Sequence, residues 1–281
     1  MKVGFIGFGE VASTLSKGIL ENGIDVVTCI EGRSSKTRKL AREIEINLCK
    51  SNREVAETSD ILFSAVTPAS AIRTAQEVGK YVRGIYVDIN NISPATAKKA
   101  LSFIKNGKTV DASIIGAVRK GLNVPIIASG PCTHELTQLN EYGMNITVVG
   151  SEIGQASAVK MLRSSFTKGI SALLFETLYA AYNMGINEEV LKYIAETECK
   201  GFKDAAVSRV ISSAYHAKRR HEEMGEVIEL LSESENPKMS KAAEEFFKMI
   251  YSELGELDKR PENYTEIFKQ IKEKKGLKDY Q

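Results

Sequence analysis

Residues 150–185 combine the pattern of a buried helix with one row of charged and hydroxyl side chains. The row has the three- and four-residue spacing of a single helix face and contains Lys160, Arg163, Ser164, Thr167 and Ser171. The apolar residues around it are Val159, Met161, Leu162, Phe166, Ile170, Leu173, Leu174 and Leu178. A buried Lys loses hydration, which disfavours its charged form and lets it exchange a proton near neutral pH. A Lys that snorkels at the edge of a core helix gives the same pattern.

The first residues of the chain have the pattern of a dinucleotide-binding turn. Residues 2–6 predict a short buried strand, and a helical pattern follows the sequence GFGEVA. In such a strand, GxGxxA, helix unit, the first Gly permits the turn and the second lets backbone N–H groups approach a pyrophosphate. We therefore expect cofactor contacts from Gly7, Phe8, Gly9, Glu10 and Val11.

The end of the second predicted strand, residues 25–30, favours NADP over NAD. A carboxylate at this place would bind the ribose 2′-hydroxyl of NAD, and an Arg would pair with the 2′-phosphate of NADP. A carboxylate and an Arg are both present. Glu31 lies early enough in the sequence to point away from the ribose, while Arg33, Ser34 and Lys36 together form a good phosphate site. The alternative is that these cations belong to a solvated loop.

Strands and helices alternate as far as residue 150, which predicts an α/β fold with one doubly wound, mostly parallel sheet. Further strands are expected at residues 47–49, 60–66, 84–89, 108–112, 124–128 and 145–149. Val66, Thr67 and Pro68 lie where a strand ends, and this is the edge at which open α/β sheets bind ligands.

After residue 150 every predicted element is a helix. Helices are expected at residues 150–185, 188–198, 203–231, 240–254 and 263–274. We therefore expect a Rossmann-type NADP-binding domain in residues 1–153 and an all-helical substrate and dimerisation domain in residues 154–281, which begins with a long interdomain helix.

Composition excludes several classes of function. A net charge of +2 shows no basic excess, so nucleic acid is not an expected partner. The four cysteines form no CxxC pair and the three histidines are poorly spaced, so we expect free thiols in the cytoplasm and no metal site. There is no signal peptide pattern and no uncharged apolar run of membrane-spanning length, so no membrane association is expected.

Four motifs in order resemble those of the β-hydroxyacid dehydrogenases, the superfamily of 6-phosphogluconate and 3-hydroxyisobutyrate dehydrogenases. The glycine turn is the first. The family's Asp-x-Ser-Thr-x-x-Pro segment matches residues 88–94, with Asn90 in a hydroxyl position, and its Asp-Ala-Pro-Val-Ser-Gly-Gly segment matches residues 111–117. Its Gly-x-Gly-x-x-x-Lys-x-x-Asn segment matches residues 154–163, which places Lys160 on the catalytic lysine.

The resemblance implies hydride transfer between a nicotinamide and a small hydroxy acid, or its keto or semialdehyde form, with Lys160 as general acid and base. It also implies a homodimer through the helical domain and a cofactor contact at Asn90. The family's substrate-binding Ser falls on Ile115 and its Asn on Arg163, as in a less characterised branch common in archaea. Arg163 suits a carboxylate or phosphate, so we expect an anionic substrate. The expected substrate residues are Ser113, Ile114, Arg163, Ser164, Thr167 and Arg219.

Three other functions stay open at this point. An imine or pyrroline-carboxylate reductase would share the fold and use NADPH without a fixed lysine. A deazaflavin-dependent NADP reductase begins with a similar glycine turn but requires a smaller helical domain. A non-catalytic sensor would bind NADP and use the helical domain to contact a partner. The basic run at residues 218–221 is either a solvated face or a segment that closes over the active site.

Overall fold

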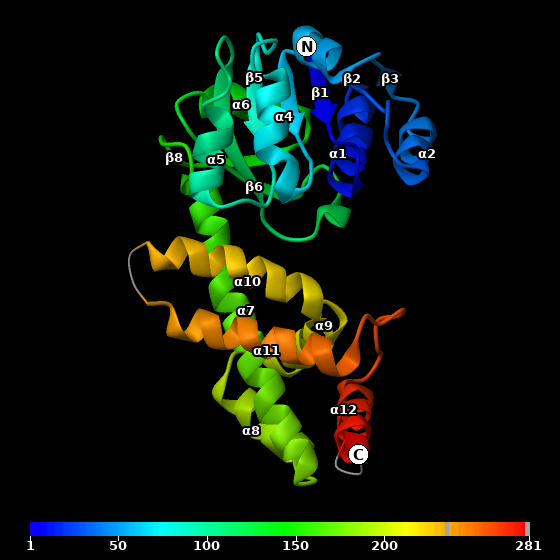
Figure 1. Ribbon diagram of the computed structural model, residues 1–281, viewed down its shortest axis with the longest axis vertical. Coiled ribbons are helices and arrows are strands. Elements are labelled where there is room, and N and C mark those ends of the chain that lie inside the picture. Colours follow the sequence, from blue (N-terminus) through cyan, green and yellow to red (C-terminus); the bar gives the residue numbers. More distant parts are fainter. Residues whose placement is uncertain (234–235, 279–281) are drawn as a thin grey trace. The chain divides into compact units, whose positions relative to one another are not determined.

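The chain folds into two compact units, Met1–Lys160 and Met161–Gln281 (Figure 1). The computed structural model describes residues 1–233 and 236–278, with side chains as far as residue 274. The first unit contains all the strands of the described chain, and the second is helical. This confirms the predicted fold class, a Rossmann-type sheet followed by an all-α region.

The first unit is built on one eight-stranded sheet with the order β3-β2-β1-β4-β5-β6-β7-β8. The strands are β1 (Lys2–Ile6), β2 (Asp25–Thr28), β3 (Asn47–Leu48), β4 (Ile61–Ser64), β5 (Ile85–Asp88), β6 (Lys108–Ile114), β7 (Pro125–Ser129) and β8 (Asn145–Gly150). Neighbours are parallel except β6 and β7. The chain order reverses between β1 and β4, and a doubly wound sheet binds its ligand at such a switch point.

Helices lie on both faces of this sheet. Successive side chains of a strand point to opposite faces, so a strand that is covered on both sides has apolar residues at consecutive positions. The helices are α1 (Glu10–Glu21), α2 (Ser35–Glu43), α3 (Asn52–Thr58), α4 (Ala71–Val78), α5 (Pro94–Leu101) and α6 (Thr133–Leu136). Phe5 and Phe63 stack on the face that α1 covers, with ring centroids 5.2 Å apart. The next residues in the alternation, Ile6 and Leu62, face the cluster formed by α3, α4 and α5.

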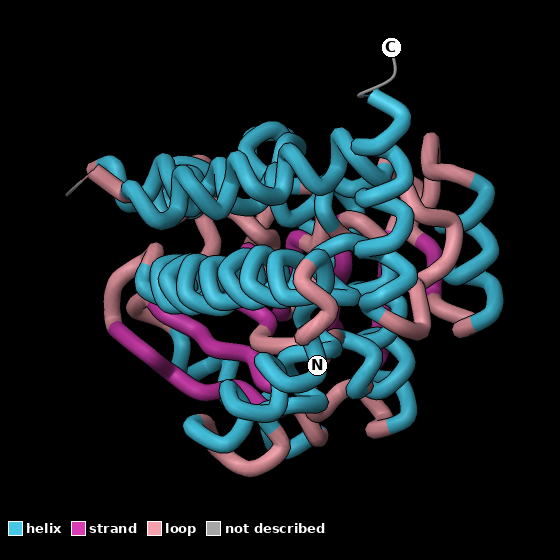
Figure 2. The backbone as a smooth tube through the Cα atoms, turned by 90° about the horizontal axis from the view of Figure 1, so that it is seen from below, coloured by secondary structure: helices cyan, strands magenta, loops and turns pink. Residues whose placement is uncertain are grey.

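The second unit consists of helices around two apolar clusters. Figure 2 distinguishes the helices (cyan) of the described chain from its strands (magenta). The helices are α7 (Gln155–Asn183), which starts in the first unit, α8 (Asn187–Thr197), α9 (Phe202–Tyr215), α10 (Ala217–Ser232), α11 (Lys238–Leu254) and α12 (Tyr264–Lys278). Phe268 is the centre of one cluster, since the rings of Phe175, Tyr179 and Tyr264 all pack against it. None of the described helices is both long and apolar enough to cross a bilayer.

The prediction of a single helix over residues 203–231 was wrong, because the chain turns at His216 between α9 and α10. The turn lets α10 fold back on α9. The guanidinium of Arg220 then donates hydrogen bonds to the hydroxyls of Ser213, at 3.0 Å, and Ser212, at 3.1 Å. A straight helix would keep these residues about 10 Å apart along its axis. No Gly or Pro marks this turn, and the hydrogen bonds of Arg220 join the two helices beside it.

The prediction that α7 is buried nearly all round was also wrong. Met161, Leu174 and Leu178 are buried, but one apolar row faces solvent. Its members have exposed fractions of 44% for Val159, 50% for Leu162, 66% for Phe166 and 61% for Leu173. Hydropathy alone cannot separate a helix side that packs inside the chain from one that the chain leaves open.

Candidate functional site

The glycine turn after β1 lies at the switch point of the sheet. Gly7 has φ +85°, and a Cβ there would come within 2.4 Å of the carbonyl oxygen of Ala65, so only Gly fits. The side chain of Phe8 is buried in the core, so this residue presents its backbone to the turn. Glu10 is exposed and Val11 is half-buried at the start of α1.

Gly9 leaves room at the N-terminus of α1. It occupies the N-cap position without a side-chain hydrogen bond, and nothing lies within 4 Å of the position its Cβ would take. Protein packing therefore does not require Gly at this position. Backbone N–H groups of a helical first turn have no partners within the helix, and they favour an anion. The residues present fit the pyrophosphate of a dinucleotide.

The predicted phosphate site after β2 lies at the surface. The hydroxyl of Ser34 accepts a hydrogen bond of 3.2 Å from the backbone N–H of Thr37 and caps α2. Arg33 is half-buried and Lys36 is exposed in the first turn of α2. The sequence therefore folds so that two cations and a capped helix start follow directly on β2, beside the glycine turn of the neighbouring β1.

A buried polar network joins the ends of β4 and β5. The side-chain oxygen of Asn90 accepts a hydrogen bond of 2.7 Å from the backbone N–H of Val66, and its amide donates to Ser64 and Asp88 at 3.0 Å each. Thr67 precedes the turn Pro68–Ser70 at the surface, and its hydroxyl donates a hydrogen bond of 3.1 Å to the hydroxyl of Ser70. Asn90 is only 3% exposed, so it orders the segment that carries Val66, Thr67 and Pro68.

Asp88 is the charged residue of that network. Burial raises the pKa of its carboxyl to about 6, the hydrogen bonds from Asn90 oppose this rise, and the nearby Asp111 adds to it. Asp88 and Asp111 are register partners on the parallel strands β5 and β6, so two buried carboxyl groups lie side by side.

Asp111, which sequence reasoning did not single out as a site residue, anchors the start of α7. Its carboxylate accepts backbone hydrogen bonds of 3.0 Å from Gly154 and Ser157 and a hydroxyl hydrogen bond of 2.7 Å from Ser157. The hydroxyl of Ser129 accepts a further hydrogen bond of 2.9 Å from the backbone N–H of Ala156. A negative charge on uncapped N–H groups stabilises a helix start. The available signal was a carboxylate in the interior of a predicted strand, because carboxylates are almost never fully buried unless they are paired.

Lys160 follows this anchored turn on α7 and is half-buried, and it engages other residues of the chain. The two predicted substrate residues on β6 are buried. Ile114 belongs to the apolar core of the first unit. Ser113 is 1% exposed, and its hydroxyl has no hydrogen-bond partner among the described residues. The structure thus links Lys160 to the sheet through Asp111 and leaves the Ile114 side chain in the core.

In the helical unit the predicted residues on α7 are accessible to different degrees. Arg163 is exposed, and Ser164 and Thr167 are half-buried. The carbonyl oxygen of Thr167 accepts hydrogen bonds from Ser171 at 2.7 Å and from Arg209 at 3.3 Å, so this turn of α7 is held to α9.

Lys168, not among the predicted site residues, contributes to a charged cluster in the same unit. Its ammonium donates to the hydroxyl of Ser164 and lies 2.8 Å from a carboxylate oxygen of Glu223. The other oxygen of Glu223 lies 3.8 Å from Nε of Arg219, which was predicted from the basic run. The structure therefore brings Ser164 and Arg219 together through Glu223 and Lys168.

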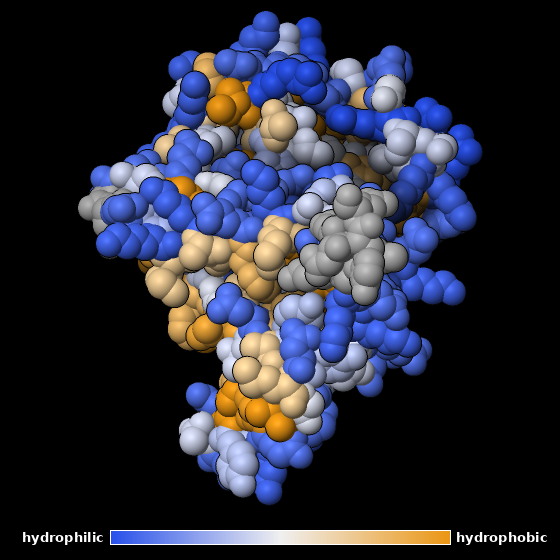
Figure 3. Space-filling view, turned by 60° about the horizontal axis from the view of Figure 1, so that its bottom comes forward, coloured by the Kyte–Doolittle hydropathy of each residue, from blue (hydrophilic) through white to orange (hydrophobic). Residues whose placement is uncertain are grey.

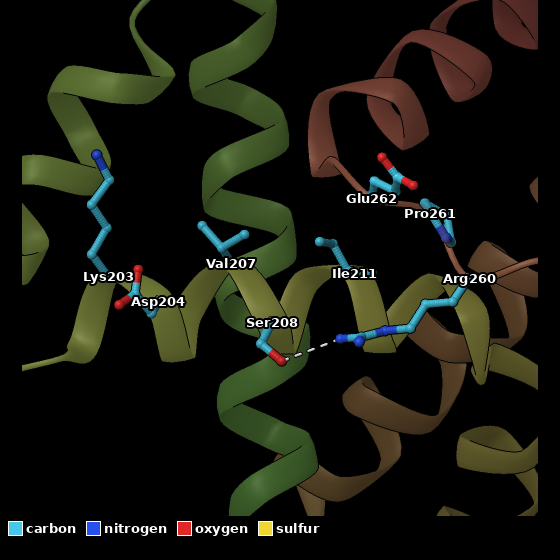
Figure 4. Close-up of a pocket in the computed structure, with 8 residues that line it drawn as sticks. All are labelled: Lys203, Asp204, Val207, Ser208, Ile211, Arg260, Pro261 and Glu262. Atoms are coloured by element: carbon cyan, nitrogen blue, oxygen red, sulfur yellow. Dashed lines mark hydrogen bonds between the residues drawn. The ribbon is translucent and has the colours of Figure 1, made fainter.

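A hollow of about 490 Å³ between α9 and residues 260–262 is separate from these groups (Figure 4). Arg260 reaches across it to the hydroxyl of Ser208 at 3.3 Å. Its lining carries both signs of charge, with Lys203 and Arg260 against Asp204 and Glu262. It contains none of the predicted site residues, and we assign it no function.

Two family models match parts of the chain. A family described as NADP oxidoreductase coenzyme F420-dependent matches residues 2–92, and a domain of unknown function, DUF1932, matches residues 181–250. The first match covers β1 to the end of β5, so it includes the glycine turn and Asn90. It supports an NAD(P)-binding domain in this part of the chain.

Among whole proteins, the chain is 43% identical over 251 residues to an uncharacterized 28.5 kDa protein of Methanothermus fervidus. The alignment covers 89% of this chain and 99% of that relative. The solved structure of the conserved protein MTH1747, described as similar to 3-hydroxyacid dehydrogenases, matches with a TM-score of 0.82 at 49% identity, covering 90% of this chain and 97% of that one. The 2-(hydroxymethyl)glutarate dehydrogenase of Eubacterium barkeri is 25% identical over 207 residues, which covers 69% of this chain and 68% of that protein.

Proposed function

The chain belongs to the NAD(P)-binding, 3-hydroxyacid dehydrogenase-like family of MTH1747 and the Methanothermus fervidus protein, and on this premise we propose that it is an NADP-dependent oxidoreductase. The reaction transfers a hydride between the nicotinamide and a small anionic hydroxy acid, or its keto or semialdehyde form. One observation carries this proposal. The carboxylate of Asp111 binds the first turn of the helix that bears Lys160, and Asp111 is the register partner of Asp88, the last residue of β5, in a dinucleotide-binding sheet.

Lys160 is the proposed general acid and base. When bound at the glycine turn, the dinucleotide supplies or accepts the hydride. In the direction of reduction, Nζ of Lys160 donates a proton to the substrate's carbonyl oxygen; in the direction of oxidation, the neutral amine accepts the hydroxyl proton. The anchored first turn of α7 fixes the position from which this proton moves. Orientation of this kind lowers the barrier because the proton carrier is already in place.

The substrate is proposed to be anionic because Arg163, Ser164 and Thr167 follow Lys160 on α7. An Arg pairs with a carboxylate or phosphate, and hydroxyl groups add donors of the right kind. The name of the Eubacterium barkeri relative specifies a hydroxy acid with two carboxylates, which supports this class of substrate.

NADP is favoured over NAD by Arg33 and Lys36, which lie beside the capped start of α2. A guanidinium and an ammonium after the second strand suit the 2′-phosphate that distinguishes the two cofactors. The four cysteines are free thiols, in keeping with a reducing cytoplasm as the place of the reaction.

A homodimer through the helical unit is the proposed assembly. Leu162, Phe166 and Leu173 form an exposed apolar row on α7, and a Cβ at Gly169 in the same row would meet nothing within 4 Å. Figure 3 shows hydrophobic surface gathered on this unit between hydrophilic areas. Contiguous exposed apolar surface of this kind is typical of protein interfaces, and the small Gly would let a second helix approach closely.

The test is a turnover assay with the purified protein, NADP⁺ or NAD⁺, and a panel of hydroxy acids that includes 2-(hydroxymethyl)glutarate. The proposal expects oxidation of at least one anionic hydroxy acid, and a loss of about 100-fold or more in kcat for Lys160→Ala. Cyclic imines with NADPH and a reduced deazaflavin with NADP⁺ are separate arms. Turnover in either of these arms alone, unaffected by Lys160→Ala, would overturn the assignment.

A further inference from the structure

The helical unit collects more positive than negative charge around Glu223. Lys168 is 8% exposed and pairs with one oxygen of this carboxylate, and Arg219 pairs with the other. Arg220 is half-buried, donates hydrogen bonds to the hydroxyls of Ser213 and Ser212, and lies over the ring of Phe247, while Arg209 donates to a backbone carbonyl. Within the described chain, the ion pairs of this cluster all end on Glu223. The cluster is therefore rich in donors and poor in acceptors.

Burial lowers the pKa of Lys168, Glu223 opposes this effect, and the neighbouring Arg220 and Arg219 add to it. Burial, with the charge of Arg219, lowers the pKa of Arg220 to about 10, so its guanidinium stays charged at neutral pH. An added anion would relieve the repulsion among these cations.

The hydroxyl of Ser164 is left with a proton to donate. An ammonium has donors and no acceptor, so in its contact with Lys168 the oxygen of Ser164 must accept. The hydroxyl proton of Ser164 then points away from Lys168, and no acceptor for it lies among the described residues. Ser164 is half-buried, so an acceptor from outside the chain can reach it.

The hydroxyl of Ser164 lies on α7 near Lys160, the proposed general acid and base. Ser164 follows Lys160 by four residues, which places the two side chains on one face of the helix. Arg163, on the adjacent position, is exposed. A ligand that exchanges a proton with Lys160 could therefore place an oxygen against the hydroxyl of Ser164.

We propose that Lys168, held by Glu223, is a positioning residue that turns the hydroxyl of Ser164 toward an anionic oxygen, a carboxylate or a phosphate, of the substrate. This inference rests on the proposed function and adds to it the group that directs substrate binding. Lys168 acts through Ser164, and the positive charge of the cluster strengthens the hydrogen bond to an anion. The purely structural alternative is that the Lys168–Glu223 pair only joins α7 to α10.

The experiment titrates the full-length protein with malonate and, separately, with inorganic phosphate, and measures heat of binding. Ser164→Ala and Lys168→Met should each weaken binding of the preferred anion about 10-fold. The double variant should also lose about 10-fold in affinity, and not about 100-fold, because both changes remove the same interaction. Ser165→Ala, next to Ser164 and bonded to Ser240, and Lys203→Met, which breaks an exposed ion pair with Glu188, are matched controls that should bind as the wild type does.

Kinetics with the substrate found in the turnover assay separate positioning from a structural role. Lys168→Met should raise KM about 10-fold with kcat nearly unchanged, because Ser164 binds the anion equally in the ground and transition states. If Lys168→Met does not fold, Lys168→Gln takes its place and should raise KM in the same direction, because the charged group that orients the hydroxyl of Ser164 is lost.

Three results would overturn the inference: no binding of either anion by the wild type, wild-type binding by Ser164→Ala, or additive losses in the double variant. The titration needs no turnover. A protein that binds malonate or phosphate through Ser164 but oxidises no hydroxy acid would contradict the proposed function and leave the anion site standing.

Discussion

The carboxylate of Asp111 on β6 holds the first turn of α7 through Ser157, with a backbone hydrogen bond of 3.0 Å and a hydroxyl hydrogen bond of 2.7 Å. Both residues are at most 2% exposed. A buried charge that is fully bonded in this way has one preferred position. The helix that carries Lys160 therefore starts from a fixed point on the sheet.

Replacing Asp111 should affect both stability and catalysis. Asp111→Asn removes the negative charge from the start of α7 and replaces one acceptor by a donor that faces backbone N–H groups. We expect the free energy of unfolding to fall by about 2 kcal/mol or more, and kcat to fall more than KM rises. Denaturant titration and steady-state kinetics measure the two effects. Asp60→Asn, at an exposed carboxylate that accepts from the backbone of Lys2, is the control and should change little.

The two glycines of the turn should respond differently to the same substitution. Gly7→Ala should lower the free energy of unfolding by about 2 kcal/mol or more, because of its positive φ and the carbonyl of Ala65. Gly9→Ala should leave stability nearly unchanged and weaken cofactor binding, because its methyl group would occupy open space at the N-terminus of α1. Thermal unfolding with and without NADP measures both. Unaltered NADP binding by folded Gly9→Ala would show that the dinucleotide does not lie there.

Arg33→Ala should reduce the preference for NADP over NAD by about 10-fold, because a charge-assisted hydrogen bond to the 2′-phosphate is lost. The dissociation constants of both cofactors should be measured by titration. Arg38→Ala removes the same charge from an exposed position on α2 and should not alter the ratio. An equal effect of both variants would mean that only general electrostatic attraction is involved.

Asp88 should make stability depend on pH. Folding raises the pKa of this carboxyl from 3.8 to about 6, so the folded protein holds the proton more tightly than the unfolded chain. The resulting stabilisation is complete below about pH 4 and is lost as the pH rises through about 6. The unfolding free energy of Asp88→Asn, relative to that of the wild type, should therefore rise between these values.

Denaturant titrations at a series of pH values give this difference, because groups that do not interact with Asp88 contribute equally to both proteins. Asp25→Asn, at the exposed first residue of β2, should show no such trend. A constant difference for Asp88→Asn across the range would contradict a raised pKa.

Phe166→Glu should dissociate the proposed dimer. The ring is 66% exposed at the centre of the apolar row on α7, and a carboxylate there would be buried in the interface. We expect the dimer dissociation constant to rise about 100-fold or more, as measured by sedimentation equilibrium. Tyr193→Glu, at a residue of α8 that is 63% exposed, is the matched control. A wild-type protein that is monomeric at all concentrations tested would contradict the proposed homodimer.

The local patterns of the sequence determined the class of fold and the glycine turn. Alternating apolar strands and helices predicted the Rossmann-type sheet, and the sequence around Gly7 and Gly9 predicted its ligand-binding edge, because each depends on residues close together in the chain. The match to MTH1747 confirms the fold and the family.

Only the tertiary structure decided which polar groups meet. Asp111 and Ser157 are 46 residues apart, and Lys168 meets Glu223 across two helices, so no periodicity could pair them. The open side of α7 is a further case, since the exposure of a helix side depends on which distant segments pack against it. A sequence specifies which side chains are able to pair, and the fold selects the pairs by bringing distant segments within hydrogen-bond distance.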